Sequence, residues 1–398
     1  MAGNLEKVST IIVLKIKLFM NFQLTDEQIL IRKTARQFAN NELAPGVVER
    51  DEKKIWPREA VQKIAELGFM GMMTDPKWDG GGMDTISYTL AMEEISKVDA
   101  STGVIMSVNN SLVCYLIEKF GSDFIKEKYL KSLASGKKLG AFSLSEPQAG
   151  SDASNMKTIA KKNGDHYLVT GIKNWVTNGI NSNIVILFAL TEKGIGHKGI
   201  SCFIVEKGLA GLETGKPENK LGIRASDTCE LYFDNVKVPV ENIIGKEGEG
   251  FKIALSTLDG GRIGIASQAL GIAQASLDAS VSYSKERIQF GKPIAENQGI
   301  QFKIADMAME IESARMLIHK AAWLKDQKQN YSHLASMAKV YASEVAMRAS
   351  TQCVQIHGGF GFMRESGIER LMRDAKITQI YEGTSEIQRV VIARALLK

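Results

Sequence analysis

The sequence predicts an α+β protein in which a small antiparallel β-sheet domain stands between an N-terminal helical domain and a C-terminal four-helix bundle. Two changes in hydrophobic period carry this prediction. Apolar residues recur with helical spacing to about residue 136, alternate with period two to about residue 243, and then return to helical spacing. We expect domains over residues 20–136, 137–243 and 244–398, preceded by an extension over residues 1–19.

The first helical block begins with a predicted capping box formed by Thr25 and Gln28, after which Ile31, Ala35 and Phe38 share one helix face. Glycines 68, 121 and 136 stand where helix C-caps are expected. Further helices are expected at about residues 57–67, 85–97, 102–120 and 122–135.

The middle block contains short runs rich in Val, Ile, Phe and Tyr, which are typical of strands. Asn163-Gly164 predicts a hairpin turn between strands at 158–161 and 166–170, because both central positions of such a turn need positive φ. The next expected strand pair covers residues 183–190 and 199–206.

Gly194, Gly196 and Gly199 satisfy the GxGxxG spelling of a dinucleotide-binding loop. That motif needs a helix after it, so that a pyrophosphate can bind at the helix N-terminus. Residues 200–205 read as another strand, and we therefore interpret the glycines as a hairpin loop.

The C-terminal block has one proline beyond residue 239, Pro293, so long uninterrupted helices can form. Four segments are long enough to pack as a bundle, at about residues 251–285, 297–326, 333–356 and 385–396.

Composition excludes several classes of function. The 50 basic and 45 acidic residues give a net charge of +5 with no long run of one sign, so no nucleic-acid surface is expected. A pI of 8.8 is compatible with a ligand that carries several phosphates. The four cysteines lie far apart without a metal-binding pattern, and we expect neither a disulfide nor a metal site.

The first nineteen residues differ in character from the rest of the chain. Their apolar stretch at 10–14 is interrupted by Lys15 and Lys17, which argues against a membrane span. The segment has Glu6 and no Arg, unlike a mitochondrial transit peptide. We expect Met20 to be the true start, with residues 1–19 disordered or not native.

Two kinds of segment could carry chemistry. Glu382 lies on a connecting segment just before the last helix, which Ser385 and Gln388 are predicted to open as a capping box. From spacing alone, a carboxylate that merely solvates a turn is the commoner case. Residues 141–152 and 173–179 end strands in loops of small and hydroxyl residues, the second with Trp175, although Trp175 taken singly could also be a core residue.

These segments, together with two others in the C-terminal part, resemble the acyl-CoA dehydrogenase family. SEPQAGSD, WVTNG, RIQFGKP, QIHGGFGF and IYEGTSEIQR occur in the family's order and spacing, and the resemblance runs from about Phe22 to the C-terminus. The SVNNSL and DGGRIGIASQALGIAQ segments resemble most the short-chain (butyryl-CoA) branch.

The resemblance implies a noncovalent FAD between the sheet domain and the C-terminal helices, with part of each site supplied by a second subunit of a homotetramer. Trp175 would cover one face of the flavin, Thr177 would bond near N5, and Arg287 would suit the pyrophosphate through paired hydrogen bonds. The implied cofactor-binding residues are Phe142, Leu144, Ser145, Ser151, Trp175, Val176, Thr177, Arg287, Phe290, Gln298, Gln355, Ile356, His357, Gly358, Gly359, Thr384, Ser385 and Glu386.

The resemblance also implies the reaction, in which Glu382 removes the α-proton of an acyl-CoA and flavin N5 accepts the β-hydride, giving a trans-2-enoyl-CoA. The Glu382 backbone N–H and a ribityl hydroxyl would polarise the thioester carbonyl, and burial would raise the pKa of the carboxylate toward the working pH. The implied substrate-binding residues are Ser151, Asp259, Gly260, Gly261, Arg262 and Gly383.

Some family branches place the base at the position of Gly261, which cannot serve here. Two departures from the family pattern stand out: Ser145 replaces a common threonine, and His357, expected to pack near the adenosine or between subunits, interrupts the QI-x-GG stretch. Either hydroxyl at 145 can bond the flavin.

The expected electron acceptor is electron-transfer flavoprotein, and the expected location is the bacterial cytoplasm, or the mitochondrial matrix in a eukaryote. Alternatives are an oxidase that uses O₂, a branched-chain or glutaryl-CoA dehydrogenase, and, in another class, a flavin-containing nucleic-acid-binding relative. The near-balanced charge argues against the last, and we expect neither nucleic acid nor membrane as a partner. The acyl chain length is not fixed by the sequence.

Overall fold

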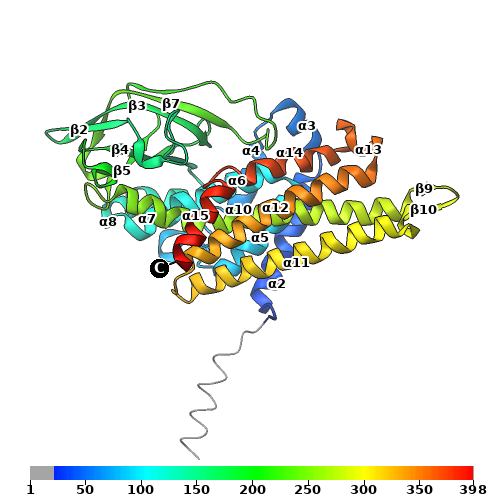
Figure 1. The fold of residues 1–398 in the computed structure, drawn as a ribbon. Helices are drawn as coiled ribbons and strands as arrows, with labels where there is room; N and C mark the ends of the chain where they lie inside the picture. The colour runs from blue at the N-terminus through cyan, green and yellow to red at the C-terminus, as the bar shows by residue number, and fades with distance from the viewer. Residues whose placement is uncertain (1–21, 398) are drawn as a thin grey trace, which may run out of the picture.

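The computed structural model describes residues 22–397, and it confirms the predicted order of helical, sheet and helical parts (Figure 1). The extension over residues 1–19 and the predicted start at Met20 lie outside the described residues. All four cysteines are free, in line with the expectation of no disulfide, and the structure also buries them.

The first part is helical and begins at the predicted capping box, in which Thr25 accepts from the Gln28 N–H and Gln28 accepts from the Thr25 N–H. Its α-helices are α2 (Asp26–Phe38), α3 (Val47–Lys53), α4 (Arg58–Glu66), α5 (Thr85–Val98), α6 (Ala100–Ser107), α7 (Tyr115–Phe120), α8 (Asp123–Ile125) and α9 (Lys131–Ala134). The π-helical turns η1 (Ala39–Leu43), η3 (Val108–Cys114) and η4 (Lys126–Leu130) join some of them.

The stretch Ala100–Phe120 is long and apolar enough to cross a membrane by length and composition. Within the molecule, however, 94% of its apolar window is buried, which is the environment of a core helix.

The middle part is an eight-stranded sheet in the order β6-β7-β3-β2-β4-β5-β8, with β1 also paired to β4. It is mixed, rather than antiparallel as predicted, because β1 and β2 both pair with β4 in parallel. Its strands are β1 (Gly140–Ser143), β2 (Ile159–Asn163), β3 (His166–Thr177), β4 (Ile184–Leu190), β5 (Ile200–Glu206), β6 (Leu212–Thr214), β7 (Thr228–Pro239) and β8 (Ile243–Ile244).

Two glycine-containing sequence motifs lie between strands of the sheet. The predicted Asn163-Gly164 turn is wrong by one residue, because strand pairing extends to Asn163, which faces His166. The turn is therefore Gly164-Asp165, and of these only Gly164 has positive φ. The GxGxxG segment connects the antiparallel strands β4 and β5, which confirms that it is a loop between strands.

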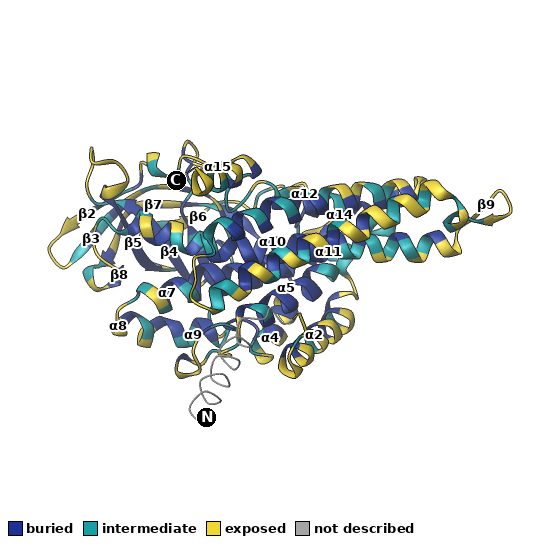
Figure 2. Ribbon diagram, turned by 60° about the horizontal axis from the view of Figure 1, so that its bottom comes forward, coloured by how far each residue is buried: buried dark blue, intermediate teal, exposed yellow. Residues whose placement is uncertain are grey.

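The last part is built on three long helices that run side by side to a protruding hairpin (Figures 1 and 2). Its elements are α10 (Gly250–Glu286), β9 (Ile288–Gln289), β10 (Lys292–Pro293), α11 (Gln298–Asp326), α12 (Ser332–His357), α13 (Gly359–Phe362), α14 (Ile368–Thr378) and α15 (Ser385–Leu396).

Helix α10 forms the centre of the core and packs against α5, α11 and α12, and all of its residues from 260 to 273 are buried (Figure 2). Gly271 permits the close approach to α5, because a Cβ at that position would lie 2.5 Å from the Glu93 carbonyl oxygen. Residues of α6, η3 and α7 share one hydrophobic cluster with α10, α11 and α12, whereas α2, α4 and α5 contribute to a second cluster.

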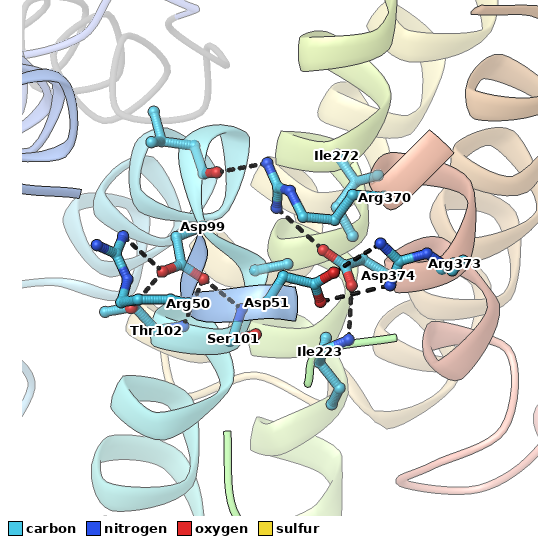
Figure 3. A network of polar contacts seen from close by, with 12 residues as sticks. Arg50, Asp51, Asp99, Ser101, Thr102, Ile223, Ile272, Arg370, Arg373 and Asp374 are labelled. Carbon is cyan, nitrogen blue, oxygen red and sulfur yellow. Dashed lines mark hydrogen bonds and ion pairs between the residues drawn. The ribbon is translucent and has the colours of Figure 1, made fainter. Parts of the chain in front are cut away.

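Helix α14 was not predicted from the sequence, and its buried face mixes the charged residues Glu369, Arg370 and Asp374 with the apolar residues Leu371 and Ala375. Figure 3 shows Arg370, Arg373 and Asp374 of this helix. Arg373 pairs with Asp51 of α3 at 2.6 Å, and Asp374 accepts from Arg370 at 3.1 Å and from the Ile223 N–H at 2.5 Å. Helix α14 is thus fixed to both the helical domain and the sheet domain.

A second buried ion pair organises the loop after β1. The Lys173 ammonium donates to Glu146 Oε1 at 2.8 Å and to the Leu144 carbonyl at 3.0 Å. Glu146 also accepts from the N–H groups of Lys157 and Thr158. Burial opposes its ionisation, but Lys173 and these hydrogen bonds lower the pKa of Glu146 to about 2. One carboxylate thereby fixes both ends of the loop that carries Ser145 and Ser151.

Replacing Glu146→Gln should lower the free energy of unfolding at pH 7 by about 3 kcal/mol, because it leaves the buried Lys173 ammonium without its counter-charge. Since the folded-state pKa lies below the ordinary value of 4.5, the carboxylate's contribution is present above pH 4.5 and is lost as the pH falls toward 2. Urea unfolding across this range measures both effects.

The matched control is Glu49→Gln, which removes the exposed partner of Lys53 and should leave the unfolding midpoint unchanged. If the two variants behaved alike, the buried pair would have no special role in the loop.

Candidate active site

Glu382 lies on the turn between α14 and α15, in a backbone conformation that side chains rarely adopt. Its φ is +52° and that of Gly383 is +92°, so two successive residues are left-handed. The turn ends at Thr384, whose side chain accepts from the Ile387 N–H and caps α15.

The predicted capping box of Ser385 and Gln388 is wrong. Helix α15 covers Ser385–Leu396, in agreement with the predicted range of 385–396, but its cap is Thr384, and Ser385 is already the first helical residue. The Gln388 amide instead turns back and donates to the carbonyls of Glu382 and Gly383, at 3.0 and 2.9 Å. Gln388 is therefore a support of the turn rather than of the helix N-terminus.

The Glu382 carboxylate lies directly over Gly261 of α10. A Cβ at position 261 would come within 2.0 Å of Glu382 Oε2 and 2.8 Å of the Leu112 side chain. Oε2 is buried and has no hydrogen-bond partner among the described residues. A glycine at 261 is thus what makes room for this carboxylate.

This environment strongly favours the protonated acid. Burial raises the pKa of Glu382 to about 8, opposed by the positive charges of Lys339 and Arg262. A carboxyl group that titrates near neutral pH and has an unused oxygen is suited to accept a proton from a ligand.

The predicted substrate-binding residues of α10 face α12 beside this carboxylate. Arg262 pairs with Asp259 at 2.6 Å and donates to Ser336 Oγ at 3.1 Å, while Ser332 donates to Asp259 at 2.9 Å. Gly260 and Gly261 lie between the two charged residues, and Gly383 follows Glu382 on the turn. Ser151 is exposed on the loop after β1.

Sequence reasoning missed a group of hydroxyls one turn further along α10. A Cβ at Gly264 would lie 2.5 Å from Tyr88 Oη and 2.6 Å from Ser107 Oγ, and Tyr88 donates to Ser107 at 3.1 Å. Tyr381 also donates to Gln268 of α10. The i, i+3 spacing of Gly261 and Gly264 was the one signal that could have indicated this face.

One set of predicted cofactor residues lies where β1 and β3 end. The Asn174 N–H of β3 donates to the carbonyl of Ser145, just after β1, at 3.0 Å and so joins the two strand ends. Trp175 has φ of +60° beside a register shift in the β3–β7 pairing, and its 61% exposure excludes the core alternative. Phe142 and Ser145 are half-buried there, whereas the Leu144 and Val176 side chains are buried. Thr177 is half-buried at the end of β3.

A second set lies at the other end of the long helices. Arg287, His357, Gly358 and Gly359 line one hollow together with Ile356, Phe360 and Tyr283, of which sequence reasoning missed the last two. The His357 ring stacks on Tyr283 of the same chain, with 4.2 Å between the ring centroids. Phe290, on the protruding hairpin, is 100% exposed. Gln298 at the start of α11 and Gln355 near the end of α12 are also exposed.

The two sets are far apart in one chain. Along α12, residues 339 and 357 are separated by roughly 27 Å at the rise of an α-helix, and Lys339 contacts the Glu382 turn whereas His357 lines the hollow. Thr384, Ser385 and Glu386 belong to the Glu382 end. A single chain therefore cannot close both sets around one compact ligand.

The residues present nevertheless fit an extended flavin dinucleotide. Trp175 offers an exposed indole, Ser385 Oγ is buried without a partner among the described residues, and a Cβ at Gly358 or Gly359 would meet nothing within 4 Å. Exposed Arg287 supplies the planar fork that suits a pyrophosphate.

Comparisons with known proteins show the family of this chain. Residues 25–137, 141–236 and 248–397 match the family models for the N-terminal, middle and C-terminal domains of acyl-CoA dehydrogenase. The short-chain specific acyl-CoA dehydrogenase of Clostridium acetobutylicum is 49% identical over 95% of this chain and 100% of its own length.

Two solved structures are similar over 95% of this chain and 100% of theirs, both with a TM-score of 0.94. One is butyryl-CoA dehydrogenase from Megasphaera elsdenii, at 50% identity. The other, at 51% identity, is described as the electron transferring flavoprotein of Acidaminococcus fermentans, in work on flavin-based electron bifurcation.

Proposed function

This chain belongs to the acyl-CoA dehydrogenase family, and from that premise we propose that it oxidises a short-chain acyl-CoA to the trans-2-enoyl-CoA, with Glu382 as the base. The observation that carries the proposal is the buried, unpaired Oε2 of Glu382 over Gly261. Similarity to short-chain relatives supports a substrate of about four carbons.

The proposed proton transfer depends on two groups of the same residue. The carboxylate accepts the α-proton, and the backbone N–H polarises the thioester carbonyl so that negative charge can develop on its oxygen. Within residues 22–397 this N–H has no intramolecular acceptor, which leaves it available for such a role. Tyr88 and Leu112 bound the same face of α10, and this favours a short acyl chain.

FAD, when bound, supplies the acceptor for the hydride that leaves the β-carbon. Phe142, Leu144, Ser145, Trp175 and Thr177 would hold the ring, with Val176 and Ser151 beside them and Thr384, Ser385 and Glu386 from the turn. The partner subunit would bind the rest of the dinucleotide through Arg287, Phe290, Gln298 and residues 355–359. The separation of the two sets supports this sharing, and we propose a homotetramer built on such pairs.

For the electrons, we propose electron-transfer flavoprotein as the acceptor. The similarity to the Acidaminococcus structure supports this choice.

Replacing Glu382→Gln should leave a yellow, FAD-loaded protein whose flavin is no longer bleached by butyryl-CoA, because the amide cannot accept the α-proton. Turnover should fall at least about a thousandfold. Anaerobic absorbance spectra measure both properties. The control Glu344→Gln, which removes a partner of Arg389 on α15, should bleach like the parent. Turnover in the Glu382 variant would place the base elsewhere.

Gly261→Ala should also abolish bleaching while FAD stays bound, because the added methyl would occupy the space of Glu382 Oε2. Gly260→Ala is the matched comparison, since its methyl would find its nearest neighbours at 3.8 and 3.9 Å. We expect stopped-flow bleaching to be far slower in the first variant than in the second. Equal rates would show that the carboxylate does not need the space above Gly261.

Sharing of the cofactor site predicts complementation between two inactive variants. Glu382→Gln and Arg287→Ala should each lose activity alone, the second through weak FAD binding. Co-expressed with different affinity tags and purified through both, the mixed oligomer should regain activity, because one of its sites combines an intact Glu382 with an intact Arg287. A mixed oligomer without activity would argue for sites contained within single chains.

A further inference from the structure

Lys339 is a buried lysine that the proposed reaction does not use. It lies on α12 and has no exposed surface. Its ammonium donates to the Gly383 carbonyl oxygen at 2.7 Å, on the turn that carries Glu382. Lys339 forms no ion pair with a carboxylate of the described chain, and the charge that acts on it most is that of Glu382. Buried lysines are rarely left in this state.

The turn that Lys339 contacts needs support. Glu382 and Gly383 both have positive φ, and a non-glycine residue in that region keeps its conformation only when its surroundings enforce it. Two side chains provide that support. The Gln388 amide donates to the carbonyl oxygens of Glu382 and Gly383, and the Lys339 ammonium donates to the carbonyl oxygen of Gly383. Lys339 approaches from α12, a rigid element of the core, whereas Gln388 belongs to the helix that follows the turn.

We propose that Lys339 is a positioning residue that fixes the Glu382–Gly383 turn through the Gly383 carbonyl and supplies the main counter-charge to the buried Glu382 carboxylate. This inference rests on the proposed role of Glu382 as the base, and it assigns to a second helix the task of keeping that base ionised.

The other charges around Glu382 leave this task to Lys339. Arg262 of α10 also faces the carboxylate, but its charge is already paired with Asp259 at 2.6 Å. Tyr88 of α5 and Tyr381 of the turn are neutral neighbours, because burial raises the pKa of Tyr88 to about 12 and raises the pKa of Tyr381 well above its ordinary value. Glu386 of α15 acts on Lys339 only as a distant, exposed anion.

The electrostatics of the pair follow from burial. Burial lowers the pKa of Lys339 to about 7, and Glu382 opposes that fall, while Lys339 in turn opposes the rise in the pKa of Glu382. Each charge therefore favours the ionised form of the other group, although burial remains the larger influence on both pKa values. When Glu382 takes a proton from the substrate, the Lys339 charge loses its counter-ion and remains beside the site where negative charge develops on the substrate.

The test separates charge from hydrogen bonding with three substitutions. Lys339→Arg keeps the charge, Lys339→Gln keeps a donor for the Gly383 carbonyl, and Lys339→Met keeps neither. The measurement is the acid limb of kcat/KM against pH with butyryl-CoA. Loss of the Lys339 charge favours the protonated form of Glu382, so the acid limb of the kcat/KM profile should move to higher pH by about one pH unit or more in the Gln and Met variants. The Arg variant should restore the limb.

The proposed support of the turn by Lys339 is tested by a separate measurement. At pH values above the limb, kcat should be lower in the Met variant than in the Gln variant, because only the latter can still support the Gly383 carbonyl. Lys220→Gln is the matched control, since Lys220 also donates to a backbone carbonyl at 2.7 Å but lies in the sheet domain and does not act on Glu382. Its limb should coincide with that of the parent.

An unmoved limb in a folded, FAD-loaded Lys339→Gln protein would overturn the proposal, and so would a shifted limb in Lys339→Arg. If the neutral variants do not fold, the acid limb of Lys339→Arg can still be measured and can still contradict the proposal. Failure of the base assignment is distinguishable, because Glu382→Gln would then turn over, whatever the Lys339 variants do. Inactivity of Glu382→Gln with an unmoved limb in Lys339→Gln would refute only the role of Lys339.

Discussion

The site depends on one packing constraint, the contact between the Glu382 carboxylate and the bare backbone of Gly261. Because no side chain projects from α10 at this point, a carboxylate on a left-handed turn can be buried against the helix without a hydrogen-bond partner at Oε2. Such a group has little solvation to lose when a ligand arrives, and its pKa lies near neutrality for the same reason. The left-handed turn and the absence of a Cβ at position 261 are both needed to place the carboxylate against α10.

Buried polar contacts hold this arrangement from outside the site. The charged face of α14 anchors that helix to α3 and to the backbone of Ile223, so the turn that follows α14 starts from a fixed point. Lys339 and Gln388 then hold the turn itself. On the sheet side, Glu146 and Lys173 do the same for the loop after β1. The core supplies most of the stability, while these ionic contacts specify where loops stand.

The long helices have a second consequence, because they carry chemistry at both ends. The sheet domain and α15 lie toward one end of these helices (Figure 1), whereas Arg287 and the hollow beside His357 lie at the other. Fully exposed Phe290 and the open glycines 358 and 359 are costly features for an isolated chain and natural ones for a surface that receives a shared ligand. These features support the proposal that the cofactor site is shared between subunits.

The sequence by itself determined the order of the three parts, most helix bounds, the loop character of GxGxxG and the segments that bear the site. These features depend on hydrophobic period and on local signals that a short window contains. Tertiary structure alone decided the parallel pairing of β4, the existence of α14 with its charged buried face, and the cap at Thr384 instead of Ser385. It also decided the meeting of Glu382 with Gly261 and Lys339, because those contacts join residues far apart in the chain, and the free energy of burying a charge depends on neighbours that no local pattern records.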